Sequence, residues 1–533
     1  MISITPQGQV YLCKTPLVND YKNQLTFANK NAQLTYFNST IQKTYDNYTY
    51  IKKDNVIKVG ENIDNLIQCN YLFYKNTGFT DKWYFCFITN MEYINENCTA
   101  ITIETDVFQT WYFDIKYKSC FIEREHVNDD TVGLHTVPEN LETGEYICNE
   151  HYKDTTMDNY ASDLCFVMAS TSEPIVGEAK DTVAPSAIYN GIYTGLTYYR
   201  YDATSAIDTI LEIFANNGKT DAINGVFMSP KWLAPLNNGS TYREVAQSNS
   251  PLSFNINVSK QNTLNGYTPI NNKLKCFPYN YLLVSNNIGQ NAILHYEKFS
   301  DNSNATFNVK GVLNPGCSVN ITPTNYNGSA SSDNDAITLG KFPICNFQND
   351  MYTNWLTQNS INVLGQTITS DDMNIAGNVL GGVSGVATNI GSGNLAGAGM
   401  SVASGFAGIA GAVMQQKQHN MIAPTINGQL NSADVNVASG NNTFHFYKMS
   451  VKAEFARIID NYFSMFGYKI NRVKVPNITG RSNWNYVKTI NCNFDGDIPQ
   501  TDLNIIRAMF NNGTTLWHNA NTMYNYNNSN NIV

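Results

Sequence analysis

Ala100-Ile-Thr-Ile-Glu-Thr-Asp-Val-Phe108 alternates apolar with polar residues at a period of two. This alternation is typical of a β-strand that buries one face and exposes the other. Trp83-Tyr-Phe-Cys-Phe-Ile88 and Tyr71-Leu-Phe-Tyr74 are further short runs of residues that favour strands. A succession of such runs predicts a β-sandwich or barrel, and we therefore expect a mainly β fold with a few short helices.

The composition indicates a large folded chain of low charge. Its 533 residues predict three or four packed units at roughly 150 residues each. Charged residues make up 14%, against about 25% in an average globular protein, which excludes charge-driven disorder. The formal net charge is −9, so no broad basic surface exists to neutralise phosphates. The composition therefore argues against a dedicated nucleic-acid-binding protein.

The first residues and the cysteines indicate the compartment of synthesis. Met1–Pro6 alternates like a strand and shows no basic region followed by an apolar run, so no secretory signal is visible. The 11 cysteines are scattered singly, without a Cys-x-x-Cys pair. We expect synthesis in the cytoplasm and buried thiols, and neither a zinc site nor a disulfide scaffold.

Changes of pattern along the chain predict four regions. A charged stretch from Glu123 to Glu142 ends the first run of strands and predicts a structured loop. The expected regions are a β-rich N-terminal region (1–150), a β-rich middle region with one helix (151–345), a connector (346–440) and an α+β C-terminal region (441–533). The connector carries an apolar segment at about 365–428.

Three stretches carry helical signals. Ser205 and Gly218 are suited to begin and end a helix in the middle region. From Ser450, a candidate N-cap, apolar residues recur at helical spacing until Gly467, which is suited to end the helix. A shorter helix is expected from Thr501 to Phe510, and the Asn-rich tail from Asn519 is expected to fray.

One segment differs from the rest of the chain. No charged residue occurs between Asp372 and Lys417, and residues 374–416 hold 11 of the chain's 35 glycines. Its apolar halves, Ile375–Ala387 and Leu395–Met414, are joined by polar residues, which predicts a hairpin of two small-residue helices. Twenty helical residues reach about 30 Å, the thickness of the hydrocarbon layer of a bilayer.

This segment is only weakly hydrophobic for a membrane span. Leu395–Met414 contains five strong hydrophobes, which together contribute about −1.5 to −3 kcal/mol on the membrane-insertion scale. We therefore expect insertion to be conditional and to need other copies of the segment. The candidate membrane-active residues are Ile375, Val379, Leu380, Val383, Val386, Ile390, Leu395, Met400, Val402, Phe406, Ile409, Val413 and Met414.

Small residues at a spacing of four allow helices to approach each other closely in lipid. The candidate helix-contact residues are Gly377, Gly381, Gly385, Ala403, Ala407 and Gly411. A buried core hairpin and a glycine-rich linker remain open as alternatives. A linker does not account for two apolar halves. A core hairpin does not account for the glycine density, because each interior glycine costs about 1 kcal/mol of helix stability.

Three blocks near the two ends of the chain resemble a known family. They are Thr110-Trp-Tyr-Phe-Asp114 with Phe121–Gly144, Phe463-Ser-Met-Phe-Gly-Tyr468 to Val473 with Asn485–Ile490, and Gly496-Asp-Ile-Pro499 with Ile505–His518. Together they are similar to the tail-knob, or distal tail-tube, proteins of small short-tailed phages that infect Gram-positive bacteria. The apolar segment lies between the blocks, where that family carries a long membrane-active loop.

The resemblance implies tail-tube-type β-sandwich or barrel domains assembled as a homohexameric ring or tube at the distal tail of the virion. Residues 1–150 and 441–533 would build the tube, and 151–345 would be an insertion domain. The loop at 365–428 would plug the lumen and then penetrate the host cytoplasmic membrane, forming a pore for DNA ejection. Implied partners are further copies, other tail proteins on the collar side, membrane lipid, and transiting DNA without sequence-specific binding.

Other groups of residues give little support to catalysis. His126, Asp129, Asp130 and His135 lack the helical His-x-x-x-His spacing of a zinc site, and in this family-like block we expect a hydrogen-bonded loop at a subunit contact. No Gly-x-Ser-x-Gly elbow occurs. We predict no enzyme, no metal and no cofactor, although paired carboxylates for glycoside hydrolysis stay open, since their spacing is spatial.

Two alternative functions stay open at this point. In the first, a receptor-binding tail protein binds wall polymer through exposed aromatic and Asn side chains, with the glycine-rich segment as an internal oligomerisation hairpin. Trp484 and Trp517 are candidates for sugar binding, although tryptophans at such positions more often belong to the core. In the second, the protein is a tail-associated peptidoglycan hydrolase.

Overall fold

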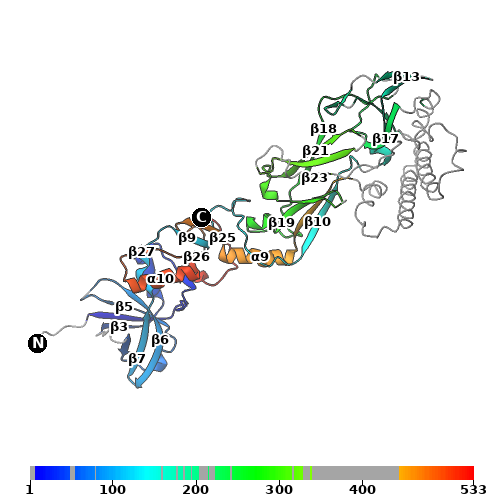
Figure 1. The fold of residues 1–533 in the computed structure, drawn as a ribbon. Coiled ribbons are helices and arrows are strands. Elements are labelled where there is room, and N and C mark those ends of the chain that lie inside the picture. The colour runs from blue at the N-terminus through cyan, green and yellow to red at the C-terminus, as the bar shows by residue number, and fades with distance from the viewer. Residues whose placement is uncertain are drawn as a thin grey trace, which may run out of the picture. The chain divides into compact units, whose positions relative to one another are not determined.

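The structure, a computed structural model, describes residues 7–48, 55–78, 80–157, 160–175, 178–183, 187–193, 195–202, 214, 222–239, 243–287, 289–314, 317–327, 337–338 and 443–533. The chain divides into two compact units. Unit one consists of Met1–Gly144, Gly266–Cys276 and Lys452–Val533, and unit two of Glu145–Asn265 and Phe277–Val451. Strands dominate both units, so the expected mainly β fold is confirmed (Figure 1).

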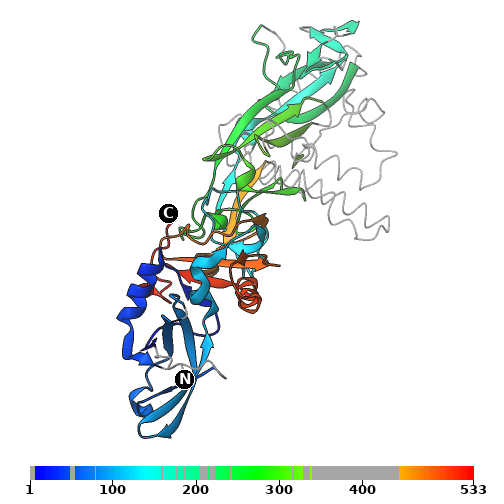
Figure 2. The ribbon, with the colours of Figure 1, turned by 90° about the vertical axis from the view of Figure 1, so that its left-hand side faces the viewer.

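A six-stranded antiparallel sheet forms one part of unit one, in the order β3-β1-β5-β6-β7-β4. The strands are β1 (Gly8–Cys13), β3 (Ile41–Tyr48), β4 (Val56–Val59), β5 (Tyr71–Asn76), β6 (Tyr84–Asn95) and β7 (Cys98–Thr105). Successive residues of β5 point to opposite faces, and Leu72 and Phe73 are both fully buried, in different core clusters. The helix α1 (Lys30–Ser39) lies alongside this sheet, with Phe37 against Phe73 (Figure 2).

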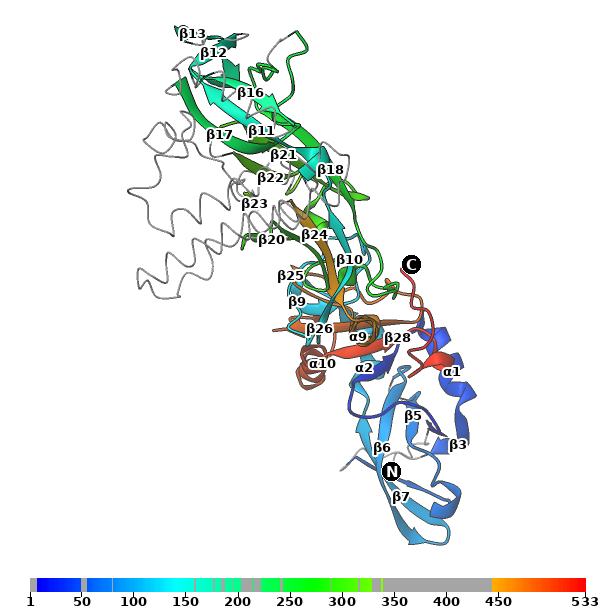
Figure 3. The same cartoon turned by 90° about the vertical axis from the view of Figure 1, so that its right-hand side faces the viewer.

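A five-stranded sheet forms the other part of unit one, in the order β2-β28-β26-β9-β25. Its strands are β2 (Asn23–Leu25), β9 (Cys120–Glu125), β25 (Tyr468–Lys474), β26 (Trp484–Ile490) and β28 (Thr514–Trp517). A separate two-stranded sheet is formed by β8 (Ile115–Lys116) and β27 (Asp495–Gly496). The helices α9 (Ala453–Phe466) and α10 (Gln500–Asn512) pack on β26 (Figure 3). Short 3₁₀ turns lie at Ile63–Asn65 (η1), Tyr112–Asp114 (η2), Asn272–Lys275 (η4) and Ala520–Thr522 (η8).

The helix α9 ends where its sequence predicted. Gly467 follows it with a φ of 64°, and its backbone N–H donates to the Phe463 carbonyl at 2.8 Å. A Cβ at this position would collide with the Glu125 backbone, so the position requires glycine. The predicted N-cap is wrong, because Ser450 lies within β24 (His445–Val451) and α9 follows Lys452 without a side-chain cap.

The strand predicted over 100–108 is too long. Asp106 accepts a hydrogen bond from the Gln109 N–H at 3.1 Å and thereby caps the short helix α2 (Val107–Trp111). The last two apolar residues of the alternating run are therefore helical. Burial raises the pKa of this capping carboxyl to about 7, and the hydrogen bonds from Gln109 and Tyr71 oppose that rise.

The C-terminal tail does not fray as expected. The side-chain oxygen of Asn530 accepts hydrogen bonds from the backbone N–H groups of Asn483 and Trp484, at 3.0 and 3.1 Å. The Asn530 amide donates in turn to the Trp484 carbonyl at 2.8 Å. These three bonds fasten the tail to the start of β26.

Unit two contains three larger sheets. One has the order β10-β24-β19-β20, another β16-β11-β17, and the third β18-β21-β22-β23. The strands are β10 (Tyr146–Lys153), β11 (Leu164–Ser170), β16 (Thr197–Tyr201), β17 (Ile223–Pro230), β18 (Leu252–Ser259), β19 (Asn280–Ser285), β20 (Asn291–Leu294), β21 (Asn304–Val312), β22 (Ser318–Thr324), β23 (Ile337–Thr338) and β24. The described residues of unit two also form the hairpins β12 (Ser172–Ile175) with β13 (Glu178–Val183) and β14 (Ile188–Tyr189) with β15 (Ile192–Tyr193), the helical turn α3 (Tyr160–Asp163) and the 3₁₀ turn η5 (Tyr296–Lys298). The helix predicted over 205–218 lies outside the described residues, apart from Phe214.

The predictions for single side chains meet different outcomes. Trp484 and Trp517 are 1% and 0% exposed, so both belong to the core and neither presents a sugar-binding surface. The ten cysteines that the structure describes are all free thiols. Most are buried as expected, but Cys98 is half-buried, and the prediction is wrong for Cys148, which is exposed on β10.

Candidate functional site

The predicted membrane-active residues and helix-contact residues all fall between Ile375 and Met414, which lies outside the described residues. Among the residues with described positions, no helix is long and apolar enough to span a bilayer. The site that follows is therefore built from the side chains of unit one.

The structure does not bring the predicted group of His126, Asp129, Asp130 and His135 together around a single point. His126 is buried, and its Nδ1 accepts a hydrogen bond from the Tyr486 N–H at 2.8 Å, so the proton is on Nε2, 3.1 Å from the Ser464 carbonyl. His135 Nε2 instead lies 2.8 Å from the carbonyl oxygen of Asp129. In the described part of the chain, no three His, Cys, Asp or Glu side chains are placed to hold a metal ion.

His126 is held neutral by its surroundings. Burial lowers the pKa of the imidazole to about 3, and the nearby Arg481 guanidinium acts in the same direction. The predicted loop begins at this residue, because the preceding charged residues Glu123, Arg124 and Glu125 belong to β9. The role of His126 is to join β9 to α9 and β26 through hydrogen bonds.

Three carboxylates form what we call the buried acid network: Glu125, Glu139 and Asp460, all fully or nearly fully buried. Glu139 contacts Arg124 and Lys273 in two ion pairs and accepts the Lys469 N–H at 2.9 Å. Both cations are themselves buried, so the buried Glu139 carboxylate is compensated by two buried positive charges.

Asp460 of α9 holds the segment Gly266–Cys276 in unit one. Its carboxylate accepts hydrogen bonds from the backbone N–H groups of Ile270 and Asn271, at 2.7 and 3.0 Å, and from the Tyr267 hydroxyl at 2.8 Å. Asp130 adds a further contact by accepting the Asn272 N–H at 2.9 Å. The network therefore joins three separated pieces of the chain.

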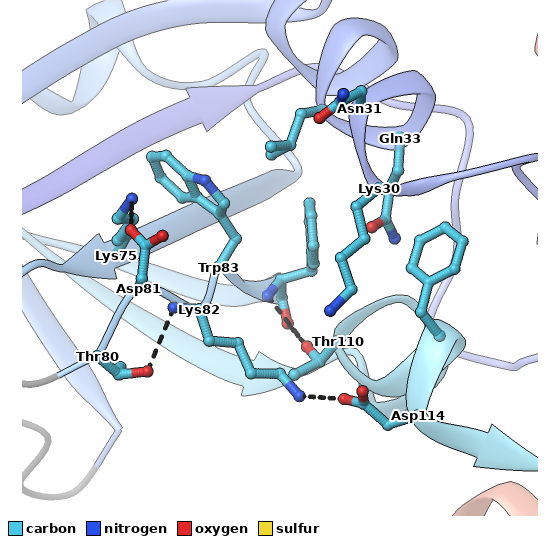
Figure 4. Close-up of a pocket in the computed structure, with 13 residues that line it drawn as sticks. Lys30, Asn31, Gln33, Lys75, Thr80, Asp81, Lys82, Trp83, Thr110 and Asp114 are labelled. Atoms are coloured by element: carbon cyan, nitrogen blue, oxygen red, sulfur yellow. Dashed lines mark hydrogen bonds and ion pairs between the residues drawn. The ribbon is translucent and has the colours of Figure 1, made fainter.

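A second group of charges lines an open cavity of about 520 Å³ in unit one, which we call the lysine cavity. It lies between the first turns of α1, the chain from the end of β5 to β6, and α2 with η2 (Figure 4). The polar lining residues are Lys30, Asn31, Gln33, Lys75, Thr80, Asp81, Lys82, Thr110 and Asp114, and the apolar ones are Leu34, Trp83, Phe85 and Phe113.

Two of the three lysines have acidic partners. The Lys75 ammonium pairs with Asp81, and Lys82 Nζ lies 2.6 Å from Asp114 Oδ2. The Lys82 ammonium also lies 3.3 Å from the centre of the Trp111 ring, a cation–π contact. Lys82 is thus held in place by a carboxylate on one side and an indole on the other.

The third lysine is the unpaired one. Within the described structure Lys30 makes no ion pair, and Figure 4 shows its side chain reaching from α1 into the cavity. Burial lowers the pKa of the Lys82 ammonium, Asp114 opposes this, and the positive charge of Lys30 adds to the lowering. The two ammonium groups are therefore close enough to repel each other, and the cavity is an attractive place for an anion.

Aromatic side chains also line the cavity. Trp83 packs at 5.5 Å from Tyr11 and edge-on to Phe73 at 5.1 Å, between ring centres. Phe113 of η2 also lines the cavity. The arrangement combines ammonium groups, carboxylates and amides with apolar surface, which is the lining of a small-ligand pocket.

Sequence reasoning missed the lysine cavity. Its residues come from four separate stretches, and none of the three lysines belongs to a motif. The one available signal was the block Thr110–Asp114, three of whose residues line the cavity.

Comparison with known proteins identifies the family of the chain. Residues 240–531 match the family model for the C-terminal domain of the tail knob protein gp9 of Bacillus phage phi29, and residues 8–116 match the model for the N-terminus of the caudoviral major tail protein. The chain is 28% identical to the tail knob protein gp9 of Bacillus phage PZA, covering 95% of this chain and 96% of that protein. The identity to the phi29 protein is 27%, with 96% of each chain covered.

A solved structure has the same fold. The tail knob protein gp12 of bacteriophage C1 superposes with a TM-score of 0.64 at 14% sequence identity, over 99% of this chain and 100% of that one. Because the phi29 model alone spans more than half of the 533 residues, the relationship extends well beyond a shared domain. The chain belongs to the family of phage tail knob proteins.

Proposed function

We propose that this tail knob protein assembles into a homohexameric conduit for DNA ejection and that its loop at about 365–428 plugs the lumen before infection. On infection the loop penetrates the host cytoplasmic membrane and forms the pore through which DNA passes. The observation that carries the proposal is the uncharged, glycine-rich stretch between Asp372 and Lys417.

Family membership supports the first part of this proposal. A tail knob protein is a component of the virion tail and contacts other tail proteins, and the relatives are named as tail knob proteins, not as enzymes. The net charge of −9 suits a conduit, since a basic lumen would bind DNA phosphates and slow their passage.

The composition of the loop supports the second part. Its marginal hydrophobicity keeps the segment compatible with assembly in water, and it still permits insertion when several copies act together. The small residues at Gly377, Gly381 and Gly385 and at Ala403, Ala407 and Gly411 supply the faces on which copies would pack in lipid.

Dye release from vesicles tests the membrane step with the whole protein. Wild-type protein is expected to release dye from lipid vesicles, and Ile409→Asp is expected to abolish release, because a charge within the apolar span opposes insertion, at a cost of up to about 2.5–3.5 kcal/mol per copy. Ile67→Asp is the matched control, since Ile67 is 78% exposed in unit one and its replacement should leave release unchanged.

Phage particles distinguish the proposal from its alternatives. Particles that carry Ile409→Asp should adsorb normally but fail to deliver DNA. Particles that fail to adsorb would support the receptor-binding alternative instead. Clearing of purified cell wall by the isolated protein would support the hydrolase and contradict a purely structural role.

A further inference from the structure

We propose that the lysine cavity binds a polyhydroxy compound, a sugar or polyol, that carries a single negative charge as a phosphodiester or a carboxylate. This inference does not depend on the membrane loop, because every residue that carries it belongs to unit one. It gives a tail knob protein a specific small-ligand site in addition to its structural role.

The charge of the cavity selects a monoanion. Its lining holds three ammonium groups and two carboxylates, so one positive charge is left over. Since the Lys75–Asp81 and Lys82–Asp114 pairs are internally neutral, the excess charge is that of Lys30. Phosphodiesters and carboxylates carry one negative charge at neutral pH, and either would balance Lys30.

The carboxylates disfavour a polyanion and favour hydroxyl groups. Asp81 is largely exposed at the edge of the cavity, and Asp114 is about one-third exposed. Each has oxygen lone pairs beyond those used by its lysine, and these accept hydrogen bonds from hydroxyl groups. Successive phosphates of a nucleic acid would be repelled by the same carboxylates, which argues against DNA or RNA as the ligand.

The size and the aromatic lining agree with a sugar or polyol. A volume of about 520 Å³ lies within the range of roughly 300–1,000 Å³ that small-molecule sites occupy. Trp83 and Phe113 provide apolar surface for the C–H groups of such a ligand, and Asn31 adds an amide. A cavity of this size would therefore take up only one repeating unit or one chain end of a polymeric ligand.

The binding groups are largely held in place before a ligand arrives. Lys82 is fixed by Asp114 and by the Trp111 ring. The Thr110 hydroxyl is fixed by the Phe85 backbone, whose N–H it accepts at 3.0 Å. Because these groups are already fixed by contacts within the protein, they lose little freedom on binding, and this lowers the entropic cost of recognition.

Calorimetric titration of the full-length protein tests the inference with defined compounds. The probes are glycerophosphoglycerol as a polyol phosphodiester, glucuronate as a sugar carboxylate, glucose as a neutral control and a short single-stranded oligonucleotide. Binding of either anionic polyol, with no binding of glucose, supports the proposal, and the preference between them identifies the anionic group. Failure of both, or tighter binding of the oligonucleotide, overturns it.

Two matched variants connect the binding to the cavity. Lys30→Gln should weaken binding about tenfold, because it removes the charge-assisted contact to the anion. Lys58→Gln is the control, since Lys58 is an exposed lysine on β4 that does not line the cavity. The affinity of this variant for the anionic polyol should equal that of the wild type. Equal affinities for wild type and Lys30→Gln, with folding verified by circular dichroism, would show that the ligand binds elsewhere.

Discussion

The buried acid network and the lysine cavity both contain carboxylates and positively charged side chains, but these side chains differ in burial and in pairing. In the network, Glu139 and Asp460 are fully buried and every contact is made within the protein. In the cavity, the charged side chains range from partly to largely exposed, and one lysine has no acidic partner among the described residues. The network therefore stabilises the fold, whereas the cavity keeps binding capacity for a ligand.

The largest expected effect is the loss of the Asp460 carboxylate. Asp460→Ala should lower the free energy of unfolding of unit one by about 3–5 kcal/mol, because several buried donors of Gly266–Cys276 lose their acceptor. Urea unfolding followed by tryptophan fluorescence measures this change.

The neighbouring residue supplies the control for this change. Asn461→Ala alters an exposed position of the same helix and should change stability by less than about 0.5 kcal/mol. Similar losses for Asp460→Ala and Asn461→Ala would contradict the stabilising role of the network.

The next effect is a pH dependence that originates at His126. Its pKa is about 3 in the folded protein and about 6.5 in the unfolded chain, so below pH 6.5 the unfolded chain binds the proton and the folded one does not. The stability present above pH 6.5 is therefore lost as the pH falls toward 3, by up to about 1.4 kcal/mol per pH unit.

His126→Gln isolates this contribution, since glutamine keeps a donor and an acceptor but does not titrate. Urea unfolding at pH 7, 6 and 5 should give a smaller slope for the variant than for the wild type. Parallel slopes would mean that His126 is not the group that binds the proton.

A smaller effect is expected for the ion pair of the cavity. Asp114→Asn should lower stability by about 1 kcal/mol or less, because both partners are partly exposed, at 26% and 30%, and solvent screens their attraction. The same urea titration measures it. A loss as large as that of Asp460→Ala would show that the cavity is a structural element like the network.

The smallest effect on stability is expected for Lys30→Gln. Lys30 has no ion-pair partner to lose within the described residues, so the free energy of unfolding should change by less than about 0.5 kcal/mol, while binding of the anionic polyol is weakened. Thermal unfolding of both proteins, with and without the ligand, separates the two properties: the wild type should gain more stability from the ligand than Lys30→Gln does.

Local sequence patterns predicted the fold where neighbouring residues determine the structure. The apolar stripe before Gly467 predicted α9 and its end, and the alternation from Ala100 predicted β7. The pattern failed at Asp106, because this capping residue follows the end of β7 at Thr105, three residues before the alternating run stops at Phe108. It failed again at the tail, where Asn530 forms hydrogen bonds to residues 46 and 47 positions earlier.

Neither charged group of unit one could be found from sequence spacing. Asp460 and its partner Asn271 are 189 residues apart, and the cavity unites four stretches. Such groups depend on which segments the fold brings together, and an isolated lysine such as Lys30 carries no local signal. The glycine-rich stretch was evident in the sequence because its composition differs from that of every other region.

Electron cryo-microscopy of the assembled protein, before and after exposure to lipid vesicles, tests the proposed conduit most directly. The account predicts a six-fold ring whose lumen is closed by the 365–428 loops in the absence of lipid and open after exposure, with those loops embedded in the vesicle bilayer. Loops that stay packed within their own subunits in the presence of lipid would contradict it.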